Sequence, residues 1–264
     1  MSLSTTRVGD PQAPHALVML HGIYGRGRNW QAIAKAVTTA RRDYSCVLVD
    51  LPYHGDSPAG RHGDTVRGLA EDLDDWLTEA ALRPRVVLGH SFGGKVALAL
   101  AERRPDWTLQ TWVIDSTPAP REAGGSAYDM LQLIARLPDT FPSREAAAEA
   151  LVDGGYTRGV AVWMATNLSR EGDAFVWRLD FAAMRRLLDN FFDTDLWPIV
   201  DNRSRTHDLH FLKASTSSAM SESAAAHVEA LNDAHVHLHR RDGTHWIHAE
   251  SPQTVIDLLV THLP

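Results

Sequence analysis

The apolar positions along the chain predict short buried strands that alternate with amphipathic helices. Four apolar runs rich in Val, Leu and Ile lie at residues 16–20, 46–50, 85–89 and 112–115. Stretches with apolar residues at helical spacing lie between them, at 30–40, 65–82 and 94–103. Continuous apolar strands joined by helices are typical of a parallel sheet that is buried on both faces. We therefore expect an α/β protein with a mostly parallel, doubly wound sheet.

This alternation stops after Asp115 and resumes near residue 203. Between these points no convincing strand is present, and helical patterns dominate at 143–152, with Ser143 as N-cap, at 157–168 and at 181–191. The regular pattern then continues with a strand at 209–214, a helix at 221–231, a strand at 236–239 and a last helix opened by Ser251 and Pro252. The sequence thus predicts a core of residues 1–116 and 203–264, interrupted by a helical cap or lid at 117–202.

Composition and charge narrow the class of protein. The chain has 264 residues, of which 44% are hydrophobic and 22% charged, as expected for one globular domain with a modest insertion. Its net charge of -7 disfavours a nucleic-acid partner, because contacts with phosphates need a surplus of Lys and Arg. The single cysteine, Cys46, lies in an apolar run and is expected to be a buried, inert thiol.

The sequence also bears on where the protein works. Residues 1–14 lack the apolar core of a signal peptide, and no run approaches the ~20 apolar residues of a membrane span. We therefore expect a soluble cytoplasmic protein without a membrane span. The sequence leaves open whether it is a monomer or a homodimer.

The apolar run at 85–89 leads into Gly89-His90-Ser91-Phe92-Gly93-Gly94, and a helical pattern follows at once. A G-x-S-x-G motif between a strand and a helix is typical of a nucleophile elbow, whose central residue adopts a strained backbone conformation. The flanking glycines are needed because a Cβ there collides with the neighbouring strand and helix. The turn lifts the serine hydroxyl out of the sheet beside a helix N-terminus, which favours negative charge. Ser91 is therefore the candidate nucleophile, and a purely structural turn is the alternative.

Two loops at the same sheet edge offer hydrogen-bond donors to an oxyanion. The first apolar strand ends in His21-Gly22-Ile23-Tyr24-Gly25, and Phe92 follows the candidate nucleophile. Attack on an acyl carbon places a full negative charge on oxygen, which preorganised backbone N–H groups stabilise. We assign these donors to Ile23 and Phe92. Taken alone, the first loop fits a tight turn without a catalytic role equally well.

A histidine near the C-terminus is the candidate general base. His245 lies after the strand at 236–239 and before the last helix, which returns it to the sheet edge that carries Ser91. The chain has 14 histidines, so most of them are expected to have other roles. His248 is the nearest competitor, but it lies one helical turn later and closer to the helix start. We therefore predict that His245 takes the proton of Ser91.

Several segments together carry a family resemblance. They are the elbow at 89–95, Asp50-Leu51-Pro52-Tyr53-His54-Gly55-Asp56-Ser57, and the ending Gly243-Thr244-His245-Trp246-Ile247-His248-Ala249. In the insertion they are Ala165-Thr166-Asn167-Leu168 and Phe175-Val176-Trp177-Arg178-Leu179. The chain resembles α/β-hydrolases of the YbfF-type esterase group. The resemblance implies an α/β-hydrolase fold with the cap inserted after the sixth core strand, and an esterase that acts on small acyl esters or acyl thioesters without a cofactor.

A serine nucleophile and a histidine base need a third residue, a carboxylate that pairs with the histidine. In many α/β-hydrolases it follows the strand that here is 209–214, but the next residues, Ser215-Thr216-Ser217-Ser218-Ala219-Met220, contain no carboxylate. The preceding core strand ends in Asp115, at the same sheet edge and 115 − 91 = 24 residues beyond Ser91. We predict that Asp115 holds His245 in one tautomer, as the resemblance also implies. An Asp that caps the turn before Pro118 is the structural alternative, and the substitutes to test are Asp180, Asp208, Glu222 and Asp242.

Other polar and aromatic groups fit structural roles. Asp50, His54 and Asp56 lack a second ligand cluster, so a hydrogen-bonding loop is expected instead of a metal site. The sequence His-Val-His-Leu-His at 235–239 indicates a strand with one polar face instead of a metal-binding tract. We therefore expect no metal. The candidate residues for the substrate pocket are the aromatic side chains Tyr24, Trp163, Trp177 and Trp246.

Three functions fit these residues. The first is hydrolysis of a carboxylic ester or thioester through an acyl-enzyme on Ser91. The second uses the same residues to cleave a C–C bond or to support elimination, because one fold hosts many reactions. The third is a ligand-binding receptor with a vestigial triad. The presence of Ser91, His245 and Asp115 favours an enzyme.

Overall fold

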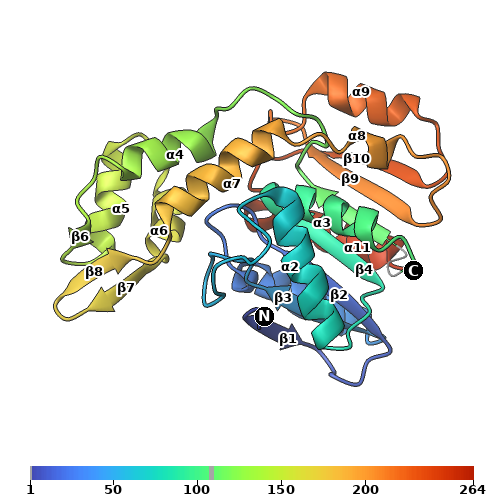
Figure 1. The fold of residues 1–264 in the computed structure, drawn as a ribbon, viewed down its shortest axis with the longest axis horizontal. Helices are drawn as coiled ribbons and strands as arrows, with labels where there is room; N and C mark the ends of the chain where they lie inside the picture. The colour runs from blue at the N-terminus through green and yellow to red at the C-terminus, as the bar shows by residue number, and fades with distance from the viewer. Residues whose placement is uncertain (1, 107–109) are drawn as a thin grey trace.

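The computed structural model describes residues 2–106 and 110–264 and contains a seven-stranded sheet (Figure 1). Its strands are β1 (Thr5–Val8), β2 (His15–Leu20), β3 (Tyr44–Val49), β4 (Val86–His90), β5 (Gln110–Ile114), β9 (Asp208–Ala214) and β10 (Val236–Arg241). Their order is β1-β3-β2-β4-β5-β9-β10, and every neighbouring pair except β1 and β3 is parallel. The expected mostly parallel sheet is confirmed. The sequence does not predict β1, because its Thr-Thr-Arg-Val segment is largely exposed and has no apolar run.

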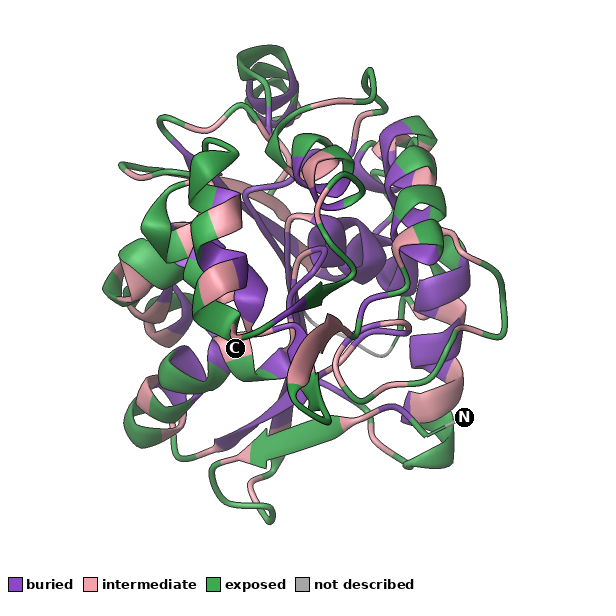
Figure 2. Ribbon diagram, turned by 90° about the vertical axis from the view of Figure 1, so that its left-hand side faces the viewer, coloured by how far each residue is buried: buried purple, intermediate pink, exposed green. Residues whose placement is uncertain are grey.

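Alternate residues of the central strands face opposite layers of helices. In β2, Leu17 and Met19 pack with α1 (Gln31–Ala40) and α11 (Pro252–His262). Val18 and Leu20 belong to the other core, which contains α2 (Val66–Glu79), α3 (Phe92–Arg103) and α9 (Glu222–Ala230). Figure 2 shows the buried strands enclosed by helices whose outer faces are exposed. Each fully buried Val or Leu side chain contributes about 1.5–3 kcal/mol, so the two cores hold the sheet and the loops at its edge in place.

The chain leaves the core between β5 and β9 to form an insert. Its helices are α4 (Ser126–Ile134), α5 (Arg144–Asp153), α6 (Arg158–Ala165), α7 (Phe181–Asp193) and the short α8 (Trp197–Val200). Figure 1 shows α4, α5 and α6 standing to one side of the core, with α7 leading back to it. The predicted N-cap of α5 is confirmed, since the Ser143 hydroxyl accepts a hydrogen bond from the N–H of Ala146 at 3.0 Å. The strand before the insert is the fifth along the chain, and the expected sixth position is wrong by one.

The expectation of a strand-free insert is wrong. A small antiparallel sheet with the order β6-β8-β7 lies within it, formed by β6 (Thr140–Phe141), β7 (Leu168–Glu171) and β8 (Ala174–Trp177). Gly172 and Asp173 connect β7 to β8, and Gly172 has a φ of 60°. A two-residue loop that begins with Gly at positive φ is a hairpin signal, but the strands that it joins have only four residues each. The predicted helix at 157–168 accordingly ends at Ala165, and Leu168 begins β7.

A buried lysine ties both ends of the insert to the core. Lys95 of α3 is 0% exposed, and its Nζ donates to the backbone oxygens of Ala119, Phe191 and Thr194 at 2.9, 2.7 and 2.7 Å. Ala119 lies where the chain enters the insert, and Thr194 follows α7 where it leaves. Burial lowers the pKa of Lys95 to about 7. The three carbonyl groups lie within hydrogen-bond range of the three N–H groups of an ammonium, so the cation is satisfied despite its burial.

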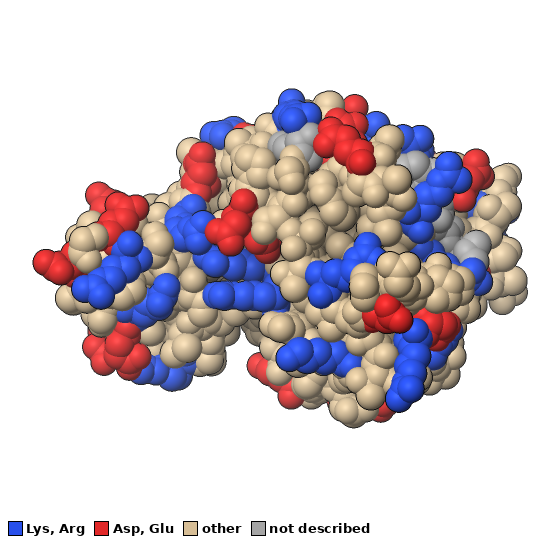
Figure 3. All heavy atoms as spheres, turned by 90° about the horizontal axis from the view of Figure 1, so that it is seen from below, with Lys and Arg blue, Asp and Glu red and all other residues tan. Residues whose placement is uncertain are grey.

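Three further features of the structure are the charges on its surface, the character of its helices and the position of its cysteine. On the face in Figure 3, acidic and basic side chains are interspersed. Among the described residues, none of the helices combines the length and the apolar character that crossing a membrane requires. Cys46 is buried as expected, and burial raises the pKa of its thiol to about 12.

Candidate active site

Ser91 occupies a strained turn between β4 and α3. Its φ of 52° and ψ of -116° are unusual for a residue with a side chain, and such strain is often found at functional sites. A Cβ on Gly89 would collide with the backbone of Gly93, and a Cβ on Gly93 would collide with the backbone oxygen of His21. The two glycines therefore allow β4, α3 and the loop after β2 to pack close enough to form this turn. The predicted strand-turn-helix context of the motif is confirmed.

His245 connects Ser91 to a buried carboxylate. Its Nε2 lies 3.1 Å from Oγ of Ser91, and its Nδ1 lies 2.7 Å from Oδ2 of Asp115. His245 precedes the short helix α10 (Ile247–Glu250), in the loop that follows β10. Asp115 comes directly after β5 and is 0% exposed. When Nδ1–H donates to Asp115, Nε2 carries the lone pair that accepts the hydroxyl proton of Ser91. The structure thus brings together the three residues that the sequence singled out.

Asp115 is held by groups that the sequence analysis missed. Its Oδ1 accepts a hydrogen bond from the N–H of Ala214 at 3.0 Å, and its Oδ2 accepts one from the hydroxyl of Ser217 at 2.5 Å. Both donors lie at the end of β9 or just after it, in the position where many α/β-hydrolases carry the acid. One sequence signal pointed to these donors. Residues 215–220 contain no carboxylate but several hydroxyl groups, which can donate hydrogen bonds to an acid on the neighbouring strand. These bonds fix the orientation of the carboxylate.

The substitute acids that the sequence left open have other partners. Asp180 caps α7 through the N–H of Ala183 at 2.9 Å, and Asp208 lies 2.8 Å from Nδ1 of His235. Glu222 lies 2.8 Å from a guanidinium nitrogen of Arg240. The structure assigns Asp242 no hydrogen bond or ion pair among the described residues. Of the candidate acids, Asp115 therefore makes the hydrogen bond to His245.

Neutral histidines pack around the loop that carries His245. Nε2 of His90 donates to the backbone oxygen of His245 at 2.8 Å, and the His90 ring lies tilted against the ring of His248, with centroids 4.1 Å apart. Burial lowers the pKa of His248 to about 3 and the pKa of His90 well below its usual value. His248 is therefore a buried packing residue. His90, the second residue of the motif, positions the loop.

The predicted oxyanion donors lie at the expected edge. Phe92 is the first residue of α3, so its N–H has no acceptor within the helix. Ile23 lies in the loop after β2, and its N–H donates to no acceptor among the described residues. Both residues line a cavity beside Ser91. His21 holds this loop, since its Nδ1 donates to the oxygen of Gly22 at 2.7 Å and its Nε2 accepts from the N–H of Leu51 at 3.0 Å.

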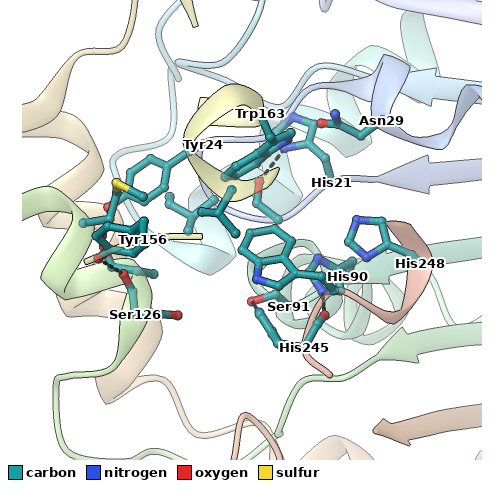
Figure 4. A pocket seen from close by; sticks show the side chains of 17 residues that line it. His21, Tyr24, Asn29, His90, Ser91, Ser126, Tyr156, Trp163, His245 and His248 are labelled. Carbon is teal, nitrogen blue, oxygen red and sulfur yellow. Dashed lines mark hydrogen bonds between the residues drawn. The ribbon is translucent and has the colours of Figure 1, made fainter. Parts of the chain in front are cut away.

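Two cavities meet at Ser91. The first is largely apolar, and Figure 4 shows Tyr24 and Tyr156 across it from Ser91 and His245. Met130, Val160, Trp163 and Trp246 also line it. The second cavity is more polar, and its lining includes Arg121, Thr216, Ser217, Ser218 and Thr244. Ser91 and His245 are shared by the two cavities.

Three of the four predicted pocket residues lie at the first cavity. Tyr24 has a φ of 62°, and its hydroxyl donates to the backbone oxygen of Ala127 at 2.8 Å. Trp163 of the insert lies against Trp246 of the core, with ring centroids 4.8 Å apart. Trp177 is not among the described residues that line either cavity. Its ring instead packs edge-on against Phe141 and Phe181 within the insert.

The loop at 50–57 is a hydrogen-bonded turn, as expected. Asp50 accepts from the N–H groups of Gly27 and Asp56 at 2.7 and 3.1 Å. His54 donates through Nδ1 to the oxygen of Pro52 at 2.8 Å. Asp56 forms an ion pair with Arg178 of the insert at 2.5 Å. The pair between Asp56 and Arg178 also attaches the insert to the core.

Comparison with known proteins places this geometry in context. The model of a family described as the alpha/beta hydrolase family matches residues 17–258. The chain is 29% identical over 263 residues to the sn-1-specific diacylglycerol lipase ABHD11 of Mus musculus, which covers 97% of this chain and 82% of that protein. It is 31% identical over 149 residues to lipase LipV of Mycobacterium tuberculosis, which covers 56% of this chain and 54% of that protein.

Solved structures share the fold. A marine microorganism esterase superposes with a TM-score of 0.85 at 20% identity, over 99% of both chains. The thioesterase domain from the curacin biosynthetic pathway superposes with a TM-score of 0.75 at 18% identity, over 98% of this chain and 95% of that one. At these identities the similarity shows the arrangement of helices and strands and leaves the reaction to the site residues.

Proposed function

The chain belongs to the α/β-hydrolase family, and we propose that it is a carboxylic ester hydrolase whose acyl-enzyme forms on Ser91. The observation that carries the proposal is the series of hydrogen bonds from Asp115 through His245 to Ser91, at 2.7 and 3.1 Å. This arrangement activates a hydroxyl as a nucleophile. The lipase names of the relatives from Mus musculus and Mycobacterium tuberculosis support ester substrates.

The geometry supports a two-step reaction. Oγ of Ser91 attacks the acyl carbon while Nε2 of His245 takes its proton, and Asp115 stabilises the imidazolium. The N–H groups of Ile23 and Phe92 donate to the oxyanion of the tetrahedral intermediate. His245 then gives the proton to the leaving oxygen or sulfur, which departs as an alcohol or thiol. A water molecule, deprotonated by the same histidine, releases the carboxylic acid from Ser91.

We assign the acyl group to the first cavity and the leaving group to the second. An acyl chain gains free energy from leaving water, about 0.8 kcal/mol for each buried CH₂, and the first cavity offers Met130, Val160 and aromatic rings. The second cavity offers hydroxyl groups and one guanidinium, which suit a polar alcohol or thiol. Ser91 lies between them and can therefore reach the ester bond of a molecule that extends into both.

The insert acts as a cap over the site in this proposal, with 117–202 as the cap and 1–116 and 203–264 as the core. Met130, Val160 and Trp163 of the insert share the first cavity with Gly22, Ser91 and Trp246 of the core. A cavity made by both parts closes only when the insert is in place. The insert therefore selects the acyl chain, while the core carries the reacting groups.

Thioesters are a second candidate substrate class, favoured by Arg121. Its guanidinium lies over the ring of Phe192, 4.9 Å from the centroid, and has no ion-pair partner among the described residues. A cation beside the leaving-group cavity favours a substrate whose thiol part carries phosphate or carboxylate groups. Replacing Arg121 with Met should then lower kcat/KM for such thioesters about 5- to 50-fold and change neutral esters little.

A panel of nitrophenyl esters with graded acyl length, measured beside acyl-CoA thioesters, tests the proposal. We expect turnover that depends on acyl length and falls by a factor on the order of 10⁴ to 10⁶ in Ser91→Ala. Circular dichroism of the variant controls for folding. If Ser91→Ala retains near-native turnover on every substrate that the native protein hydrolyses, the assignment of the nucleophile is wrong.

A further inference from the structure

A group of histidines lies on the sheet away from Ser91. Its members are His210 on β9, His237 and His239 on β10, and His262 at the end of α11. Asp208 begins β9, six residues before Ala214, which donates to Asp115 (214 − 208 = 6). At ~3.3 Å for each strand residue, about 20 Å separates the two ends of β9, so this group lies well away from the reacting atoms.

The pairing of β9 with β10 brings the ligand-bearing side chains together. The two strands are parallel neighbours, and His210 lies directly opposite His237. Side chains alternate between the two faces of a strand, so Asp208 and His210 share one face of the sheet with His237. The structure places one ligand atom from each of Asp208, His210 and His237 within 4.8 Å of one another. The predicted strand at 236–239 is confirmed as part of β10, but a sequence pattern does not place Asp208 and His210 beside it.

His210 has an open ring nitrogen. Its side chain is 3% exposed, and its Nε2 is buried without a hydrogen-bond partner among the described residues. Its Nδ1 lies 3.0 Å from Nε2 of His239. When Nδ1–H donates to His239, Nε2 carries a lone pair that faces no donor. Metal-binding histidines commonly donate their other ring N–H to a neighbouring acceptor, which fixes the tautomer and the ring orientation.

Stacking holds the rings of His210 and His239 in place. Both rings stack on the indole of Trp112, with centroids 4.3 Å away for His210 and 5.3 Å away for His239. The open nitrogen of His210 is therefore kept in one orientation.

We propose that Asp208, His210 and His237 bind a divalent transition-metal ion such as Zn²⁺ at the β9–β10 edge of the sheet. Two imidazoles and one carboxylate are ligands that Zn²⁺ commonly takes, with water in the fourth position. Zinc ligands lie about 2.0–2.2 Å from the ion, so the three atoms must approach one another by small rotations of their side chains. Asp208 and His237 are only partly buried, which permits these rotations and gives the ion a path from solvent.

The carboxylate of Asp208 is already oriented for this role. Its Oδ1 lies 2.8 Å from Nδ1 of His235, so one oxygen is held by a neighbouring ring. The bound ion joins β10, the outermost strand of the sheet, to β9. Since the edge strand has a neighbour on one side only, this link stabilises the folded protein. The site is separate from the proposed esterase site and does not depend on it.

Titration of tag-free, chelator-treated protein with Zn²⁺ by calorimetry tests the proposal. The native protein should bind one equivalent of Zn²⁺ per chain more tightly than any further Zn²⁺. At ~100 times the Kd of this equivalent, Zn²⁺ should raise the Tm by about 5–10 °C. His237→Ala and Asp208→Asn should each weaken this equivalent by about 100-fold or more. Both should retain their zinc-free Tm and their ester hydrolysis. Titration with Co²⁺ adds a second readout, since its absorption bands report nitrogen ligands.

His227→Ala is the matched control, because His227 forms a partly exposed pair with Asp201 at 2.9 Å outside this group. The control should bind Zn²⁺ as the native protein does. If the native protein binds Zn²⁺ no more tightly than His237→Ala and Asp208→Asn, or if His227→Ala loses the same equivalent, the proposed site does not exist. If one of the two ligand variants fails to fold, the other decides the result.

Discussion

Four buried histidines around the site make the protein sensitive to mild acid. Burial lowers the pKa of His21 to about 4 and those of His54 and His248 to about 3, and it lowers the pKa of His90 well below its usual value. In the unfolded chain these groups titrate near pH 6.5. Below that pH the unfolded state binds more protons than the folded state. The free energy of unfolding therefore falls as the pH decreases.

The size of the effect follows from the pKa difference. Between pH 7.5 and pH 5.5, each histidine that stays neutral in the folded state lowers the free energy of unfolding by roughly 1 kcal/mol. Four such groups together give several kcal/mol, a large part of the ~5–15 kcal/mol that stabilises a typical protein. His210 and His239 act in the same direction, because burial lowers the pKa of each. The exposed His62 has its pKa raised by Asp75, so it acts in the opposite direction and offsets a part.

Urea unfolding at pH 7.5, 6.5 and 5.5, followed by tryptophan fluorescence, measures this dependence. His248→Phe removes one titrating group and keeps a ring against His90 and Trp30. The decrease between pH 7.5 and pH 5.5 should then shrink by roughly 1 kcal/mol. A free energy of unfolding that stays constant over this range, or an equal decrease in His248→Phe, would refute the reasoning.

Three further predictions concern the site. Asp115→Asn should keep the fold and lower kcat by up to ~10⁴, because an amide cannot stabilise the imidazolium; activity within a few-fold of native would move the acid elsewhere. Ser217→Ala removes one hydrogen bond to Oδ2 of Asp115 and should lower kcat about 10-fold with little change in KM, measured by steady-state kinetics. Ser223→Ala is the control with unchanged kcat, because Ser223 is exposed on α9 and is not among the residues that line either cavity. Trp163→Ala should change the preferred acyl length more than the rate on the shortest ester, because Trp163 lines the first cavity. Trp177→Phe is the control and should leave the dependence of turnover on acyl length unchanged. An equal loss of rate on all esters in Trp163→Ala would instead indicate damage to the fold.

The local signals of the core were sufficient to predict most of the site. The elbow is a short-range structure, since the clashes at Gly89 and Gly93 arise within one strand-turn-helix unit. Asp115 and His245 follow strands of a parallel sheet, and the carboxyl ends of such strands meet at one edge. Because Asp115 and His245 were each predicted to follow such a strand, they were also predicted to lie near each other. The geometry of their hydrogen bonds was not needed for that prediction.

The features that were missed depend on registers between distant segments. The contact of Ser217 with Asp115 requires the pairing of β5 with β9, and the contact of His210 with His237 requires the pairing of β9 with β10. A shift by one residue would turn either side chain to the opposite face. The small sheet of the insert was missed for another reason. Its strands have two to four residues, too few for a period of two to stand out.

Formation of an acyl-enzyme on Ser91 can be observed directly. The protein reacts briefly with a nitrophenyl ester, acid stops the reaction, and the intact mass is measured. The modified peptide is then sequenced. We expect an added acyl group on Ser91 in the native protein. In His245→Ala this acyl group should accumulate if the substitution slows its hydrolysis more than its formation. We expect no added mass in Ser91→Ala. An acyl group on another residue, or equal labelling of Ser91→Ala, would contradict the assignment of Ser91 as the nucleophile.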